Sequence, residues 1–465
     1  MKDLKYLSGF NNQFVSEALP DVILEGRNSP QKVPYGLYAE QLNASAFSVE
    51  RAHNLHAWLY RQVPSVSHGE FQPFVQSKFK TPPFETPMPP TQLRWNPLPS
   101  SKKNTDFIDG LFTLLGNGQA SDMTGAAIHL YHCNRSMTKT RRYFFNADGE
   151  LLLIPQKGSL LLKTEMGLLK ISPDEIAVIP RGVKFQVDLL EKEARGYLLE
   201  NFGLPFRLPE LGVLGANALA HPRDFLYPSA WYENKSGKYS LVEKFQGNLW
   251  QAPIDHSPLD VVAWTGNCAP YKYNLNLFNV INTVSFDHPD PSIFTVLQSP
   301  STVSGVSNLD FSIFPPRWMV AENTFRPPYY HRNIMSEYMG LIRGVYDAKA
   351  EGFVPGGSSL HNCMSAHGPD KQAYDKAIYA ELKPEYYEGT LAFMLESRFA
   401  WNAPSQALDA DFRQPDYLKV WQGLENNFNQ AAHPSRLFSK KEKRKRAEEL
   451  PEKEVGRPTH SAKAF

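Results

Sequence analysis

Between residues 143 and 200 the chain runs through short apolar segments that turn-forming residues separate. The stretch YFFNADGELLLIPQKGSLLLKTEMGLLKISPDEIAVIPRGVKFQVDLL is broken at DG, KG, MG, PDE and PRG. Each apolar segment has the length of a β-strand, and each break is a turn signal. The pattern predicts four or five strands in a meander or barrel.

The rest of the chain carries weaker versions of the same pattern. SIFTVL, MGLIRGVY and TLAFMLE predict a second group of short strands between about residues 281 and 400, and residues 201–280 look less regular. Residues 1–110 are rich in Pro, Asn and aromatic residues, as in FNNQF and FETPMPPTQLRWNPLP, and predict a loop-rich region with some strands. The 37 prolines and 29 glycines are spread throughout the chain, which favours a mainly β fold with few helices.

Length predicts more than one domain, because 465 residues exceed what one hydrophobic core usually serves. We expect an N-terminal β-rich domain at 1–280, a C-terminal domain at 281–435 and a charged tail at 436–465. The basic run from Lys440 to Arg446 can mark nucleic-acid binding. Such a run is much more often a solvated helix or a frayed tail.

Overall charge and apolar patterning exclude several partners. The formal net charge is +1, with 49 Lys and Arg against 48 Asp and Glu, which gives no reason to expect nucleic acid or an anionic membrane. The start MKDLKYLSGFNNQF has no signal-peptide core, and no run of about 18 apolar residues occurs. We therefore predict a cytoplasmic protein. Cys133, Cys268 and Cys363 lie far apart and are expected to be reduced and structural.

Four of the 13 histidines, His288, His331, His361 and His367, fall within 80 residues of one another. A lone histidine is more often structural than a ligand, but the surroundings of this group differ. In FRPPYYHRNIMSEYMGLIRG, His331 and Glu337 are six residues apart, a spacing that a strand–turn–strand can bring onto one face of a barrel. These residues are candidate metal ligands.

The pattern His331-x-Asn333-x₃-Glu337-x₆-Gly344 resembles the first metal-binding motif of the cupin superfamily. Asn333 stands where many cupins carry a second histidine, so another ligand must come from elsewhere. Downstream, Pro355-x-Gly357 resembles the turn of the second motif, after which either His361 or His367 could reach the same metal. Two imidazoles and one carboxylate form the facial triad of non-haem Fe(II) oxygenases. A salt-bridged cluster without a metal would have a similar pattern.

The segment Pro173–Phe185 also resembles the second cupin motif, with Pro180-x-Gly182 as its turn. Phe185 occupies the place of the motif's histidine. His129 and His132 are nearby, but no acidic residue follows at the needed spacing. We interpret this first module as metal-free, so the chain is predicted to be bicupin-like, with two jelly-roll or β-barrel modules and one working site.

A narrower resemblance covers roughly residues 5–435. YYHRNIMSEYMGLIRGVYDAK and GFVPGGSSLHNCMSAHGPD resemble the catalytic segment of homogentisate 1,2-dioxygenases. Further segments resemble that family in the same order: SGFNNQF, NSPQKVPYGLYAEQL, ETPMPPTQLRWNP, LGANALAHPRDF and DHPDPSIFTVLQSPS.

The resemblance implies roles for individual residues. His331, Glu337 and His367 match the Fe(II) ligands, with His367 also against the substrate, and His288 matches a proposed catalytic acid/base. Tyr346 matches a substrate-binding position.

Two neighbours of these residues are less well defined. His361 is a plausible second-sphere hydrogen-bonding residue. Tyr338 stands where the family is expected to favour Phe, which we interpret as a surface-compatible change.

The implied activity is Fe(II)- and O₂-dependent opening of the homogentisate ring to maleylacetoacetate in tyrosine and phenylalanine breakdown, by a trimer or a dimer of trimers (a hexamer). Two alternatives remain at this stage. One is a ring-cleaving cupin that acts on a different dihydroxylated acid, such as gentisate. The other is a non-enzymatic storage or sugar-binding bicupin whose site has decayed.

Overall fold

The computed structural model describes residues 4–346, 348–349 and 351–429. Contacts between residues separate a unit that ends at Trp421 from one that begins at Gln422. The first unit is built mainly of strands. Its α-helices within the described ranges are short: α1 (Met137–Thr140), α2 (Lys371–Ile378) and α3 (Ser405–Leu408). The prediction of a mainly β chain with few helices is confirmed.

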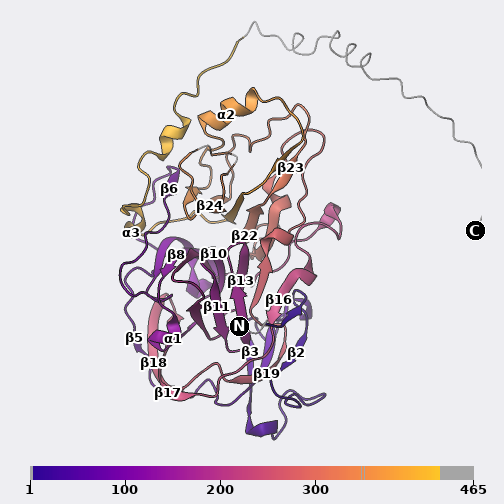
Figure 1. Ribbon diagram of the computed structural model, residues 1–465, viewed down its shortest axis with the longest axis vertical. Helices are drawn as coiled ribbons and strands as arrows, with labels where there is room; N and C mark the ends of the chain where they lie inside the picture. Colours follow the sequence, from indigo (N-terminus) through magenta and orange to yellow (C-terminus); the bar gives the residue numbers. More distant parts are fainter. Residues whose placement is uncertain (1–3, 347, 350, 430–465) are drawn as a thin grey trace, which may run out of the picture. The chain divides into compact units, whose positions relative to one another are not determined.

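Residues 142–201 form seven strands that are divided between two sheets (Figure 1). The first sheet has eight strands in the order β1 (Tyr6–Ser8), β16 (Phe225–Pro228), β20 (Tyr271–Asn274), β13 (Glu175–Ile179), β10 (Glu150–Lys157), β15 (Ala194–Asn201), β8 (Thr124–Cys133) and β7 (Leu111–Gln119). The second has seven strands in the order β12 (Gly167–Ile171), β11 (Leu160–Thr164), β14 (Phe185–Leu189), β9 (Arg142–Asn146), β17 (Ser236–Phe245), β18 (Asn248–His256) and β5 (Gln72–Pro73). Apolar side chains of both sheets share one core.

The expectation that residues 201–280 would be less regular was wrong for residues 236–274, which are mostly strand. This stretch contains the long hairpin β17–β18, whose strands pair from Phe245 and Asn248 outward. Gln246 and Gly247 form its turn, with φ angles of 47° and 77°. A two-residue turn with positive φ at both positions suits the twist of a hairpin. Such turns usually carry Asn-Gly or Asp-Gly, so Gln-Gly gives a weaker signal in the sequence.

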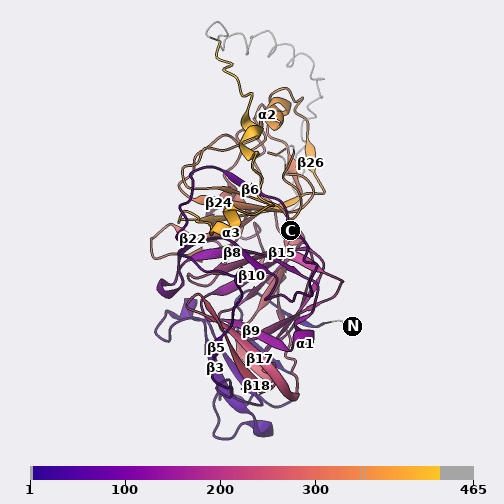
Figure 2. The ribbon, with the colours of Figure 1, turned by 90° about the vertical axis from the view of Figure 1, so that its left-hand side faces the viewer.

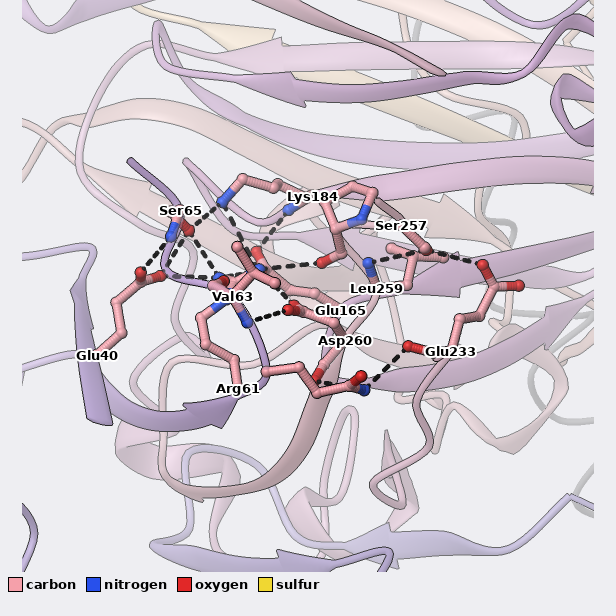
Figure 3. A network of polar contacts seen from close by, with 12 residues as sticks. Glu40, Arg61, Val63, Ser65, Glu165, Lys184, Glu233, Ser257, Leu259 and Asp260 are labelled. Carbon is pink, nitrogen blue, oxygen red and sulfur yellow. Dashed lines mark hydrogen bonds and ion pairs between the residues drawn. The ribbon is translucent and has the colours of Figure 1, made fainter. Parts of the chain in front are cut away.

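Three strands of the N-terminal region and one later strand form a four-stranded sheet, in the order β2 (Phe14–Glu17), β19 (Val261–Gly266), β4 (His56–Arg61) and β3 (Tyr38–Asn43). Arg61, the last residue of β4, is buried with three carboxylates around it (Figure 3). Its guanidinium lies 2.8 Å from Glu40, 2.9 Å from Glu165 and 2.8 Å from Asp260. Burial alone would lower the pKa of Arg61, but these carboxylates raise it above its ordinary value. The ion pairs therefore join this sheet to the β11–β12 turn.

Replacing Arg61 by Met should destabilise the fold by about 3–5 kcal/mol, because three buried carboxylates would lose their shared cation. Urea unfolding followed by tryptophan fluorescence would measure the change. Lys383→Met is a suitable control, since the Lys383–Glu381 pair is 69% and 79% exposed. That variant should stay within about 1 kcal/mol of the unmodified chain. Equal midpoints for the two variants would contradict the assigned role of Arg61.

Most strands of the C-terminal half of the first unit form a six-stranded sheet. Its order is β21 (Thr295–Pro300), β22 (Ser307–Phe314), β27 (Leu391–Ser397), β24 (Ser336–Arg343), β25 (Ser358–His361) and β6 (Leu93–Trp95). A two-stranded ladder pairs β23 (Arg317–Met319) with β26 (Glu385–Tyr387). The strands predicted at SIFTVL, MGLIRGVY and TLAFMLE are confirmed as β21, β24 and β27.

The edge strand β6 comes from the loop-rich N-terminal region. It is the purple strand beside the orange strands of this sheet in Figures 1 and 2. Trp95 on β6 is fully buried, and its indole N–H donates to the Ala407 carbonyl at 2.9 Å. An early segment of the chain thus completes a sheet formed by late segments. The boundaries at 280/281 and 435/436 stay predictions, and the charged tail from residue 436 lies outside the described residues.

Tyr197 on β15 fixes the six-stranded sheet against the eight-stranded one. Its hydroxyl donates toward the carbonyls of Gly357 and Leu341, at 2.8 and 3.1 Å. Its ring packs edge-on against Phe393, with centroids 4.8 Å apart. Gly340 lies beneath these rings, where an added Cβ would be 2.3 Å from the Phe393 ring. The approach of the two sheets therefore requires glycine in the middle of β24.

Among the described residues, no helix combines the length and the apolar character needed to cross a membrane. The cytoplasmic location stays a prediction.

Candidate metal centre

The pairing register of three neighbouring strands fixes the position of Glu337, the acidic candidate ligand. On β24, Glu337 lies opposite His361 of β25 on one side and opposite Glu396 of β27 on the other. Residues directly opposite in a ladder point to the same face of the sheet. These three side chains therefore line one face, and all three border the same cavity.

The two candidate histidine ligands meet through their backbones. His331 and His367 form an isolated antiparallel bridge in which each N–H donates to the other's carbonyl, at 2.9 and 3.1 Å. A pair that exchanges both hydrogen bonds holds its side chains next to each other. The imidazole centroids are 4.2 Å apart. The bridge lies just before β24 and shortly after β25, which brings both rings to Glu337.

The side-chain atoms of these three residues converge. Candidate donor atoms of His331, Glu337 and His367 all lie within 4.8 Å of one another. His331 Nε2 is 3.4 Å from Glu337 Oε1, and His367 Nε2 is 3.0 Å from Oε2. On each ring Nδ1–H donates to a backbone carbonyl, of Tyr329 at 2.8 Å and of Ser365 at 2.9 Å. Carbonyls in this position orient metal-binding histidines with Nε2 toward the ion. The arrangement fits a metal ion.

Burial and charge separate two neighbouring acids. Burial opposes ionisation of Glu337, but hydrogen bonds from His331 and His367 outweigh it and lower its pKa. Burial, together with the negative charge of Glu337, raises the pKa of Glu396 to about 8. Ionisation is therefore favoured at Glu337 and opposed at Glu396.

A cavity of about 530 Å³ opens over the three candidate ligands, a size that suits a small molecule. His288 and Tyr346 are both in its wall. The Nδ1–H of His288 donates to the Pro289 carbonyl at 2.8 Å, and the ring meets Tyr329 edge-on at 6.0 Å. Tyr346 is buried against Phe314, with ring centroids 5.6 Å apart.

His361 lies behind the candidate ligands. Its ring stacks on His367 with centroids 4.2 Å apart and planes 6° from parallel. Its Nε2 is 2.8 Å from the Tyr417 hydroxyl. Burial, and then the nearby His367, lower the pKa of His361 well below its ordinary value. Of the two histidines that the cupin pattern left open, His367 faces Glu337 and His361 faces Tyr417.

Sequence reasoning missed three residues at this site. Lys349 is buried in the cavity wall, with Nζ 2.8 Å from the Gly368 carbonyl, and burial lowers its pKa to about 7. Glu396 could have been found, because it is a lone acid at the end of the apolar segment LAFMLE. Tyr417 is distant in sequence and no local pattern marks it.

The interpretation of Tyr338 as surface-compatible was wrong. This side chain is 0% exposed on β24. Residues that follow one another on a strand face opposite sides. Glu337 faces the cavity, so Tyr338 points to the opposite face of the sheet, where its ring lies 6.2 Å from that of Phe393 on the neighbouring strand β27.

The first module satisfies its buried histidines differently. His129 Nε2 is 3.2 Å from Glu200, and His132 Nε2 is 2.9 Å from Glu193. Both acids come from the region of β15, too far along the chain for a spacing rule to find them. The Lys244 ammonium lies 2.6 Å from the other oxygen of Glu200. The metal-free interpretation of this module stays a prediction.

Two imidazoles and one carboxylate at a cavity in a mainly β chain define the class of non-haem metal oxygenases. Two family models cover most of the chain: homogentisate 1,2-dioxygenase N-terminal matches residues 5–275, and homogentisate 1,2-dioxygenase C-terminal matches residues 276–428. The chain therefore belongs to the homogentisate 1,2-dioxygenase family, a family of ring-cleaving dioxygenases.

Solved structures match this chain only distantly. Protein Ylba from E. coli is 10% identical with a TM-score of 0.28, and the match covers 66% of this chain and 91% of that one. A cupin 2 conserved barrel domain protein from Leptotrichia buccalis is 10% identical with a TM-score of 0.24, over 62% of this chain and 87% of that one. AerE from Microcystis aeruginosa is 9% identical with a TM-score of 0.26, over 66% and 98%.

Glu337→Gln should abolish stable metal binding, because a neutral amide is a poor ligand for a hard cation. Metal content after loading with Fe(II) without air, followed by gel filtration, would measure the loss. Glu322→Gln, an exposed position, should retain as much metal as the unmodified chain. Full metal retention by Glu337→Gln would exclude Glu337 as a ligand.

Proposed function

We propose that this chain catalyses the Fe(II)- and O₂-dependent cleavage of homogentisate to maleylacetoacetate, a step of tyrosine and phenylalanine catabolism. The convergence of His331, Glu337 and His367 on one point beside the cavity is the observation that carries the proposal. Membership of the homogentisate 1,2-dioxygenase family supports the choice of substrate.

His331, Glu337 and His367 would hold the iron. Such a donor set leaves three coordination positions open, which is enough for an organic substrate and O₂. When bound, Fe(II) lowers the pKa of a ligated phenol and activates O₂.

His288 is proposed to act as the acid/base. Its Nδ1–H is given to the Pro289 carbonyl, so Nε2 is the basic nitrogen of the neutral ring. An imidazole titrates in the range needed to accept a phenolic proton at neutral pH. His288 would take the proton of a ring hydroxyl and return it later in the reaction.

Other residues of the cavity wall suit an aromatic acid. Tyr346 carries a phenol that can donate to the carboxylate arm of homogentisate. Arg332 supplies positive charge in the same wall, and Lys349 supplies a further hydrogen-bond donor. His367 would lie against the substrate as well as hold the metal, and stacking on His361 restrains its ring.

Cytoplasmic location and assembly complete the proposal. The family implies a trimer or a dimer of trimers, and a net charge of +1 gives no reason to add nucleic acid as a partner.

His288→Phe should retain iron but lose about 10²–10⁴-fold in turnover, because only the acid/base group is removed. Iron content and O₂ uptake with homogentisate would be measured on the same sample. His53→Phe is a matched control at an exposed position and should be unaffected. Normal turnover by His288→Phe would show that His288 has no catalytic role.

O₂ uptake with a panel of dihydroxyaryl acids tests the substrate. Homogentisate should be turned over fastest, with maleylacetoacetate as the product. Faster turnover of gentisate would reject the proposed substrate. Relatives that cleave gentisate usually bind iron through three histidines, whereas Glu337 here offers a carboxylate.

Iron analysis separates the proposal from a non-enzymatic bicupin. Protein purified without air should carry a substantial fraction of one iron per chain. Less than about a tenth of an iron, with no activity after Fe(II) is added, would favour the non-enzymatic alternative, because this donor set normally retains its metal.

A further inference from the structure

The side-chain amide of Asn333 has one possible orientation. Its Oδ1 accepts a hydrogen bond from the Met335 backbone N–H at 3.1 Å. Its Nδ2 lies 3.3 Å from Glu337 Oε1 and 2.9 Å from Glu396 Oε1. A flipped amide would place an oxygen against two carboxyl groups and an NH₂ group against a backbone N–H. The amide therefore donates one hydrogen to each acid.

Glu396 is fixed on the other side of this amide. It lies in β27, opposite Glu337 on β24 and opposite Asp310 on β22, so three acids form a row across the sheet. A carboxyl oxygen accepts from an amide whether or not the group is protonated. Glu396 can thus anchor Asn333 in either state, and its strand has hydrogen-bonded neighbours on both sides.

Glu337 needs such a restraint. The terminal torsion of a glutamate side chain is broad, so the chain alone does not set the orientation of its carboxylate. The two histidines are held by backbone carbonyls, whereas within the described residues the Glu337 carboxylate contacts only side chains. Asn333 is the neutral donor that reaches it.

We propose that Asn333 and Glu396 are positioning residues that hold the Glu337 carboxylate at the point shared with His331 and His367. Glu396 acts only through Asn333, and Asn333 acts by its hydrogen bond to Glu337 Oε1. The inference rests on the proposed role of Glu337 as a metal ligand. It also assigns a use to the asparagine that stands where many cupins have a further histidine.

Loss of Asn333 or Glu396 should lower the metal affinity without abolishing metal binding. Outer-sphere partners of metal ligands typically contribute 10–100-fold to metal affinity. Asn333→Leu keeps the size of the side chain but removes both donated hydrogen bonds. Glu396→Leu removes the anchor, whereas Glu396→Gln keeps an acceptor oxygen for Asn333.

The test is a titration of the full-length chain with Fe(II) against a competing chelator, without air. Asn333→Leu and Glu396→Leu should each lower the affinity about 10–100-fold, and the double variant should lose little more, because both act through one contact. Glu396→Gln should restore most of the affinity. Asn104→Leu, an exposed control, should match the unmodified chain.

A second readout uses Co(II) in place of Fe(II), because its visible spectrum reports coordination geometry without turnover. Asn333→Leu should change this spectrum. Asn333→Leu could instead unfold at a lower temperature while its Fe(II) affinity and its Co(II) spectrum stay unchanged. That result would show a merely structural role and would overturn the proposal. If Asn333→Leu does not fold, Glu396→Leu carries the same test.

The outcomes also distinguish the proposed function from the positioning role of Asn333 and Glu396. An unmodified chain that binds no Fe(II) would overturn both the proposed function and the positioning role. If the unmodified chain binds Fe(II) and both Asn333→Leu and Glu396→Leu bind it equally tightly, only the positioning role would be overturned.

Discussion

The paired backbone hydrogen bonds between His331 and His367 are the contact on which the site depends. They join two loops that lie 36 residues apart and place both imidazoles beside one carboxylate. Without this bridge, Glu337 would be a buried acid without the two imidazoles beside it. The bridge itself needs both loops to leave β24 and β25 in the observed register, so the sheet and the site are determined together.

The sheet beneath the site is held from outside its own half of the chain. The edge strand β6 comes from the first hundred residues, and Tyr197 of the first module donates toward the carbonyls of Leu341 in β24 and of Gly357 just before β25. Both contacts restrain strands that carry site residues. A change in the N-terminal region can therefore reach the cavity through packing, although none of its side chains is among the candidate ligands.

Buried charged side chains have three kinds of partner in this fold. Arg61 is surrounded by acids, and Glu200 of the first module is paired with the Lys244 ammonium. At Glu337 the partners are two imidazoles whose Nδ1–H groups are already given to carbonyls. A lysine supplies a fixed positive charge, whereas the third arrangement can offer three lone pairs to an ion that replaces the protons between the two Nε2 atoms and the carboxylate. That difference separates a structural pair from a candidate metal centre.

The sequence by itself determined the β class, many of the strands and the candidate ligands His331 and Glu337, because apolar segments, turn residues and the spacing of these two residues are local patterns. Those patterns left His361 and His367 open as the third ligand, and the family resemblance favoured His367. Tertiary structure decided which residues that are far apart in the sequence lie close together. It brought Glu396 and Tyr417 to the site, buried Tyr338 and placed β6 at the edge of the C-terminal sheet. Cross-strand register and sheet packing create these contacts between residues that no sequence period links.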